Sequence, residues 1–138
     1  MLFKVIIFLI FFKPLDGWTM QNTLNKDDLS SYRWKNRLLL VYSRTDEHKK
    51  SKEEQIALFD QNLNENDIRK LLLIPFKKTN AAFLNKFLKM KPFKVLLIGL
   101  DGSVKKSFNE PIKMNLVYDL IDSMPMRKRE MNKNQDTK

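Results

Sequence analysis

The chain of 138 residues contains no cysteine, one histidine and three glycines. Without a thiol there is no disulfide, no thiolate zinc or iron–sulfur centre and no cysteine nucleophile, so thiol-based oxidoreductase activity is excluded. One histidine cannot form a multi-histidine metal site. Few glycines and no low-complexity runs argue against a fibrous or wholly disordered chain. We therefore expect a globular protein without a cofactor or a metal site, and we assign no catalytic residue.

The residues that are present suit one domain with one core. Hydrophobic side chains make up 43% of the chain, which is enough to fill the interior of a domain of this length. Lysine and arginine outnumber the acids by 26 to 16, and the net charge of +10 favours anionic partners. Basic and acidic residues are interleaved as on a solvated surface, which argues against nucleic acid. We expect an unknown protein or an anionic envelope component as the partner.

The first residues form an apolar segment, MLFKVIIFLIFF, with Lys4 ahead of the unbroken run and Pro14 behind it. The run is far shorter than the ~20 residues that span a bilayer, so it predicts no permanent transmembrane helix. A basic residue before a short apolar run is typical of a secretory signal peptide, which we place at residues 1–17. The alternatives are an uncleaved anchor and a buried first strand. We expect an exported protein, periplasmic or extracellular.

Hydrophobic patterning predicts the order of the remaining elements. Short continuous apolar runs are typical of buried strands, and apolar residues three, four and seven positions apart are typical of helices. Strands are predicted at 37–43 and 71–76, helices at 51–63, 80–89 and 114–124, and a hairpin at 94–100 and 103–108 around Asp101-Gly102. A linker at 18–28, a domain at 29–126 and a basic flexible tail at 127–138 complete the division of the chain.

This order, β-α-β-α-β-β-α, defines an α/β fold with a mixed sheet covered by helices on both faces, which is the order of the thioredoxin-like core. In that core the functional loop follows the first strand and leads into the first helix. Here the loop, 44–50, contains Arg44 and His48 but no thiol. A base formed by His48 with a neighbouring acid is the enzyme alternative, for which the sequence offers no nucleophile.

A second candidate is an aromatic and basic segment before the first strand, with Tyr32, Arg33, Trp34 and Arg37. Tryptophan and arginine are common anchors of interfaces, so the segment is a possible binding surface. The simpler interpretation, which we favour, is that Trp34 packs over the edge of the core. The basic residues Arg127, Lys128 and Arg129 provide either a contact for an anionic surface or only a polar helix exit.

Three blocks together resemble a bacterial domain-of-unknown-function family of small exported thioredoxin-like proteins: LSSYRWKNRLLLV at 29–41, VLLIGLDGSVK at 95–105, and the segment from Glu110-Pro111 to LIDSMPMR at 120–127. A more distant similarity is to the repeated domain of equarin and of the sushi-repeat-containing secreted proteins. The resemblance implies an exported thioredoxin-like fold without catalytic residues to carry over. The chain departs from it at Lys113, where a helix-capping Ser or Thr is expected, and at Pro92, whose place as a cis-proline stays open.

These observations favour an exported, redox-inactive thioredoxin-like module that binds or supports other components of the bacterial envelope. The first alternative is an enzyme that uses loop 44–50 with His48. The second is a cytosolic nucleic-acid binder, which would require the first residues to be part of the fold.

Overall fold

The structure is a computed structural model that describes residues 23–89 and 91–136. The expected signal peptide, residues 1–17, lies outside the described residues. Within the described part of the chain, no helix is both long enough and apolar enough to cross a membrane.

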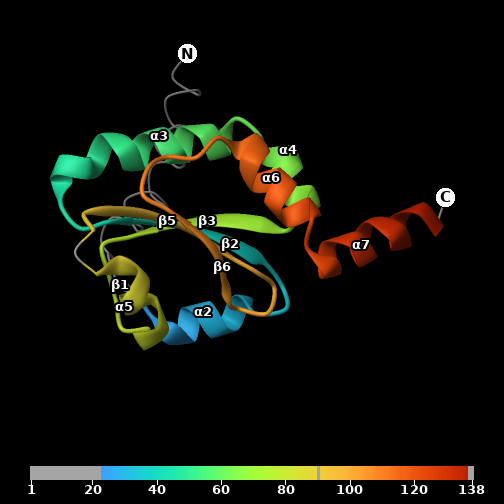
Figure 1. The fold of residues 1–138 in the computed structure, drawn as a ribbon, viewed down its shortest axis with the longest axis horizontal. Coiled ribbons are helices and arrows are strands. Elements are labelled where there is room, and N and C mark those ends of the chain that lie inside the picture. Colours follow the sequence, from blue (N-terminus) through green and yellow to red (C-terminus); the bar gives the residue numbers. More distant parts are fainter. Residues whose placement is uncertain (1–22, 90, 137–138) are drawn as a thin grey trace, which may run out of the picture.

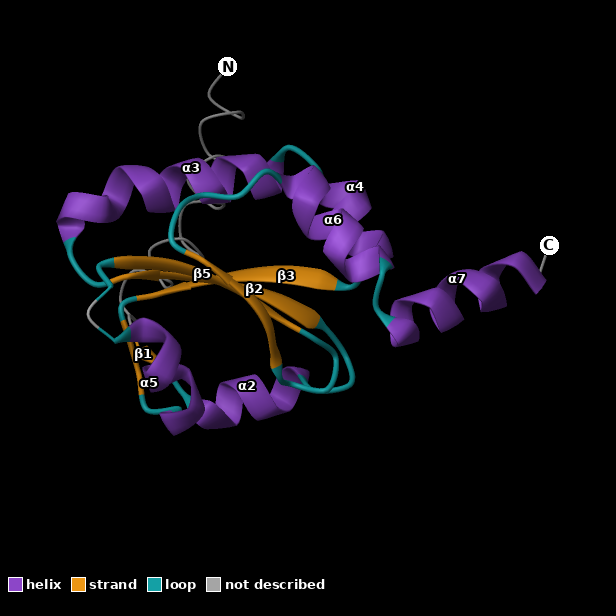
Figure 2. Ribbon diagram, viewed as in Figure 1, coloured by secondary structure: helices purple, strands orange, loops and turns teal. Residues whose placement is uncertain are grey.

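Four strands form the central sheet in the order β3-β2-β5-β6 (Figures 1 and 2). They are β2 (Arg37–Ser43), β3 (Leu71–Phe76), β5 (Phe93–Ile98) and β6 (Val104–Phe108). β2 runs parallel to β3 and antiparallel to β5, which in turn pairs antiparallel with β6. Beside this sheet, β1 (Thr23–Leu24) pairs in parallel with β4 (Lys78–Thr79). The mixed sheet confirms the predicted α/β fold class, and the likeness to thioredoxin stays a prediction.

Helices cover both faces of the sheet, as Figure 2 shows. The helices are α2 (Lys26–Tyr32), α3 (Lys49–Asp60), α4 (Leu63–Ile68), α5 (Ala82–Leu88), α6 (Met114–Asp122) and α7 (Pro125–Asp136). One face carries α3, α4 and α6, and the other carries α2 and α5. The last helix, α7, extends away from these layers beyond the end of α6 (Figure 1).

The central strand β2 organises the core because all seven of its residues are buried. Leu39 and Val41 face a cluster that includes Val117 and Ile121 of α6. The alternate residues of β2 face a second cluster with Leu84 of α5. Successive side chains of a strand point to opposite faces, so one apolar run supplies both clusters. Each fully buried leucine contributes about 1.5–3 kcal/mol to folding, so the leucines of β2 make a large contribution to stability.

The predicted hairpin between β5 and β6 is confirmed. Gly102 has φ 82°, and its N–H donates to the carbonyl of Gly99 at 3.0 Å. Asp101 Oδ1 accepts hydrogen bonds from the Ser103 N–H at 3.0 Å and from Ser103 Oγ at 2.8 Å. Asp101 Oδ2 pairs with Lys105 Nζ at 2.9 Å. Partial burial raises the pKa of Asp101, but these hydrogen bonds outweigh it and lower the pKa to about 2.

The linker expected at 18–28 differs in its second half, because Thr23–Leu24 form β1 and α2 begins at Lys26. Two contacts with the segment after β3 hold this part in place. Thr79 Oγ1 donates to the Leu24 carbonyl at 2.6 Å, and the Lys26 N–H donates to Asn80 Oδ1 at 2.8 Å. The part of the linker before Thr23 lies outside the described residues.

The C-terminal prediction also differs from the structure. The helix predicted at 114–124 ends earlier, because α6 ends at Asp122, and Pro125 is the first residue of a further helix, α7. Proline suits the first position of a helix because its missing N–H would have no partner there. In place of a flexible tail, residues 127–136 are helical, and Arg127 is buried. No peptide bond among the described residues, including the one before Pro92, is cis.

Candidate binding surface

The structure separates the predicted site residues between the two ends of β2. Tyr32, Arg33 and Trp34 precede its first residue, whereas Arg44 and His48 follow its last. Seven residues at ~3.3 Å each give a strand of ~20 Å, so these two groups cannot form one site.

The loop after β2 does not assemble a catalytic group around His48. The histidine ends a short 3₁₀ turn, Asp46–His48, and is half-buried. Asp46 is 89% exposed and pairs with Lys77 at 3.4 Å. Across residues 23–89 and 91–136, no side chain hydrogen-bonds to the His48 imidazole, and no three potential ligands gather for a metal ion. A general base needs an orienting partner, and no described side chain provides one for His48.

At the other end of β2, ahead of its first residue, Trp34 is the most unusual residue. Its side chain is 61% exposed and its φ is 67°, so the expectation that it packs over the core edge is wrong. The Trp34 N–H donates to the Leu100 carbonyl at 2.7 Å, and the N–H groups of Lys35 and Asn36 donate to the Tyr32 carbonyl at 2.9 Å each. These bonds hold a left-handed turn that points the indole outward. A tight turn at a large non-glycine residue has no local sequence signature, which is why patterning missed it.

Arg33 lies between Trp34 and the β5–β6 hairpin. Its guanidinium carbon is 5.7 Å from the centre of the Trp34 ring. Its Cγ and Cδ approach Gly102 so closely that a Cβ built there would lie 3.6 Å from each of them. A cation above an aromatic face contributes about 0.5–1 kcal/mol at an exposed position. Tyr32, Arg33, Trp34 and Lys35 thus form an aromatic and basic surface, called here the Trp34 surface.

A second left-handed residue lies at the same end of the sheet. Lys70 has φ 54° and immediately precedes β3. Its carbonyl accepts the Arg37 N–H at 2.9 Å and Asn36 Nδ2 at 3.2 Å. Such conformations cost about 1–3 kcal/mol each and concentrate at functional sites. Trp34 and Lys70 lie at the starts of the adjacent parallel strands β2 and β3. They make this end of the sheet a better candidate for the functional site than the loop around His48.

Two predicted surface residues are instead internal. Arg37 is 1% exposed and Arg127 is 5% exposed, and both bind Glu130 Oε2 at 3.3 Å. Arg127 also binds Asp122 Oδ1 at 3.1 Å, and Asp122 Oδ2 binds Arg69 at 2.8 Å. Their guanidinium groups therefore hold β2, α4, α6 and α7 together. Lys128 and Arg129 are exposed on α7, and their role as a contact surface stays a prediction.

Asp122 lies at the centre of this partly buried ion cluster. Burial raises its pKa, but hydrogen bonds from Arg69 and Arg127 outweigh burial and keep the pKa below its usual value. Burial lowers the pKa of Arg69, and its bonds to Asp122 and Glu65 outweigh that effect and raise it. Sequence patterning missed this cluster because its members are scattered from Arg37 to Glu130 among ordinary surface charges.

A neutral chain of hydrogen bonds lies beside the cluster. The Tyr118 hydroxyl donates to Asn66 Oδ1, and Asn66 Nδ2 donates to the Phe59 carbonyl at 2.8 Å. Arg69 stacks over the Tyr118 ring with its guanidinium carbon 4.4 Å from the ring centre. Burial raises the pKa of Tyr118, so this hydroxyl stays protonated and acts as a donor.

These features define a mixed α/β domain with an exposed aromatic and basic surface and, at one end, a partly buried ion cluster. The chain belongs to the family described as "Domain of unknown function (DUF4174)", which it matches over residues 28–130. This confirms the domain-of-unknown-function family that the sequence blocks resemble. Its bacterial origin and its likeness to equarin stay predictions.

The chain is also similar to coiled-coil domain-containing protein 80 of Danio rerio, with 28% identity over 133 residues. The match covers 75% of this chain and 15% of that protein, so the chain spans only a small part of the relative's length. No solved structure matches the chain.

Proposed function

We propose that the protein is an exported, non-enzymatic and redox-inactive thioredoxin-like module that binds a partner through the Trp34 surface. One observation carries the proposal: Trp34 is 61% exposed and lies in a left-handed turn held by the Leu100 carbonyl. An apolar ring that faces water on a strained backbone costs stability, and tryptophan and arginine dominate the binding energy of interfaces. Binding is the function that this arrangement supports best.

The scaffold and the composition support the other parts of the proposal. A parallel β2–β3 pair, followed by the antiparallel β5–β6 hairpin, suits a thioredoxin-like core. The absence of cysteine supports a redox-inactive role. The net charge of +10 and the exposed Lys128 and Arg129 of α7 favour a partner protein with an acidic face or an anionic component of the bacterial envelope.

The binding proposal is tested with immobilised full-length protein and envelope extracts, with Trp34→Ala as the variant. Phe83 of α5 is an exposed aromatic residue, 42% exposed, so Phe83→Ala is the matched control. We expect the unchanged protein and the Phe83→Ala variant to capture the same partner. Trp34→Ala should bind it about thirtyfold more weakly, the effect of losing ~2 kcal/mol from an interface anchor. Recovery of the same components by an unrelated protein of equal charge would contradict the proposal.

Export is tested separately by the intact mass of the protein from fractionated cells. We expect a species in the envelope or extracellular fraction that lacks roughly the first fifteen to twenty residues, the length of a signal peptide. Full-length protein in the cytosol would overturn export without affecting the Trp34 surface. Full-length protein in the membrane fraction would instead indicate an uncleaved anchor.

A further inference from the structure

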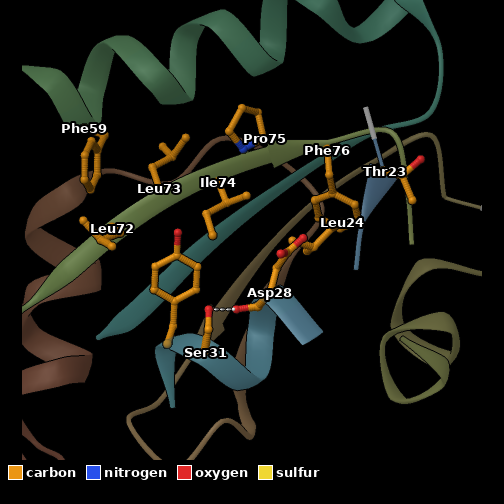
Figure 3. A pocket seen from close by; sticks show the side chains of 11 residues that line it. Thr23, Leu24, Asp28, Ser31, Phe59, Leu72, Leu73, Ile74, Pro75 and Phe76 are labelled. Carbon is orange, nitrogen blue, oxygen red and sulfur yellow. Dashed lines mark hydrogen bonds between the residues drawn. The ribbon is translucent and has the colours of Figure 1, made fainter. Parts of the chain in front are cut away.

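A groove of about 370 Å³ runs beside β3, one of the two edge strands of the described sheet (Figure 3). β3 supplies one wall, α3 contributes Phe59, and β1 and α2 supply the opposite side. The groove is lined by Thr23, Leu24, Asp28, Ser31, Tyr32, Phe59, Leu72, Leu73, Ile74, Pro75 and Phe76. Of the lining residues, Tyr32 alone also belongs to the Trp34 surface. We refer to this feature as the β3 groove.

The hydrogen-bonding groups on the open side of β3 follow from its pairing with β2. Arg37 lies opposite Leu71, and its N–H donates to the Lys70 carbonyl at 2.9 Å. The N–H and carbonyl groups of successive strand residues point to alternate sides within the sheet. Those of the even-numbered residues of β3 therefore point toward β2. The N–H and carbonyl of Leu73 therefore face the open side. No backbone group of the described residues pairs with them there.

Pro75 supports this assignment. It is one of the odd-numbered residues whose backbone faces away from β2, so its missing N–H costs no hydrogen bond within the sheet. A strand added to the open side could pair with Leu71 and Leu73, and at Pro75 it would find only a carbonyl acceptor. The free edge thus suits a short extended segment of about three to four residues at ~3.3 Å per residue.

The charge of the β3 groove is opposite to that of the whole chain. Its lining contains one acid, Asp28, and no lysine or arginine, although the protein carries a net charge of +10. Figure 3 shows the Asp28 side chain rising from α2 toward Leu24. Its carboxylate makes no ion pair with any described residue. With respect to the described residues, the groove therefore presents an unpaired strand edge, apolar walls and a carboxylate without an ion-pair partner.

We propose that the β3 groove binds an extended peptide segment of another protein as an added strand. Apolar side chains of the peptide pack against Leu72 and Phe59, and a lysine or arginine pairs with Asp28. Main-chain hydrogen bonds to Leu73 supply affinity, and the apolar and acidic contacts supply selectivity.

The test measures the fluorescence anisotropy of two labelled octapeptides with the full-length protein. One peptide alternates valine with lysine, and the other alternates valine with glutamate. The overall charge of the protein alone would favour the glutamate peptide, whereas the β3 groove favours the lysine peptide. We expect tighter binding of the lysine peptide. Asp28→Asn should weaken it about threefold, as expected for an exposed ion pair, and Asp27→Asn on the same helix should not.

A second pair of variants tests the position of the peptide. Leu72→Lys places a cation in the groove, and Leu63→Lys places the same charge on exposed α4, outside it. We expect Leu72→Lys to abolish binding of the lysine peptide and Leu63→Lys to preserve it. Peptides N-methylated on alternate residues are a further probe. Methylation of the set of residues whose N–H groups donate to β3 should abolish binding.

Several results would overturn the proposal. They are tighter binding of the glutamate peptide, equal effects of Leu72→Lys and Leu63→Lys, and the absence of saturable binding by either peptide. Concentration-dependent dimers that Leu72→Lys disrupts would assign the groove to a second copy of the chain. Slow hydrogen exchange at the Leu73 amide in the free protein would show that the edge is already covered.

Discussion

Arg37 and Glu130 join the first residue of β2 to the last helix of the chain. Both terminal nitrogens of the Arg37 guanidinium bind the Glu130 carboxylate at 3.3 Å, across 93 positions of sequence. Arg37 Nη1 also donates to the Arg69 carbonyl at 2.9 Å, whereas the buried Arg37 Nε has no hydrogen-bond partner among the described residues. Desolvation of this cation is therefore offset chiefly by Glu130, and α7 is part of the fold because it carries that carboxylate.

Glu130→Gln should destabilise the protein by about 2 kcal/mol, because it leaves the buried Arg37 cation without its counter-charge. Urea denaturation of the variant measures the free energy of unfolding. Glu53→Gln is the control, since Glu53 is 61% exposed and lies 3.9 Å from Lys49. Exposed pairs of that kind contribute 0 to ~1 kcal/mol. Equal destabilisation by the two substitutions would show that the Arg37–Glu130 pair contributes no more to the free energy of unfolding than an exposed pair.

Asp101 predicts how stability depends on acid pH. Its pKa in the folded protein is about 2, below its ordinary value of 3.8. A depressed folded pKa means that the contribution of Asp101 is present above the unfolded pKa and is lost as pH falls from about 4 to about 2. In Ser103→Ala, which removes one donor, the NMR titration midpoint of Asp101 should move upward. An unchanged midpoint would assign the low pKa to other groups.

Trp34→Gly should separate stability from binding. Glycine adopts positive φ without the steric cost that a side chain incurs, so we expect the thermal midpoint to rise, with a gain of about 1 kcal/mol in the free energy of unfolding. The same variant should lose the partner of the Trp34 surface. Calorimetry and the binding assay together check both effects. A lower thermal midpoint would show that the exposed indole stabilises the fold.

Tyr118→Phe should cost about 1–2 kcal/mol, because it removes the donor to Asn66 Oδ1 and leaves that buried oxygen without its hydroxyl partner. Tyr32→Phe is the matched control, since the Tyr32 hydroxyl makes no hydrogen bond to any described residue. Denaturant midpoints of both variants provide the comparison. If both substitutions had the same effect, the Asn66 contact would contribute nothing to stability.

The strands were predictable because their signal is local. The apolar runs at Arg37–Ser43 and Leu71–Phe76 match β2 and β3 at both ends, since a strand buried on both faces needs an unbroken run. The Asp101-Gly102 turn was likewise predictable from its own two residues. The helix expected at 51–63 was less accurate: α3 covers Lys49–Asp60, and a separate helix, α4, follows it. Charged residues at helix ends carry a weaker signal than apolar runs.

The candidate site was predictable only in part. The segment around Trp34 was recognised from its composition, but patterning placed the indole against the core and treated Arg37 and Arg127 as surface cations. Whether an arginine is buried depends on the carboxylate that meets it, and Glu130 reaches Arg37 only after β2 and α7 have been brought together.

Local patterning thus sufficed for the order of strands and helices and for the exclusion of thiol chemistry, because both depend on residue types and short spacings. Contacts between distant segments set the burial of Arg37, the outward turn of Trp34 and the open edge of β3. Each of these depends on a partner far along the chain: Glu130 for Arg37, the Leu100 carbonyl for Trp34, and β2 for β3. Ion pairing and backbone hydrogen bonding act over a few ångströms in space, whatever the separation in sequence.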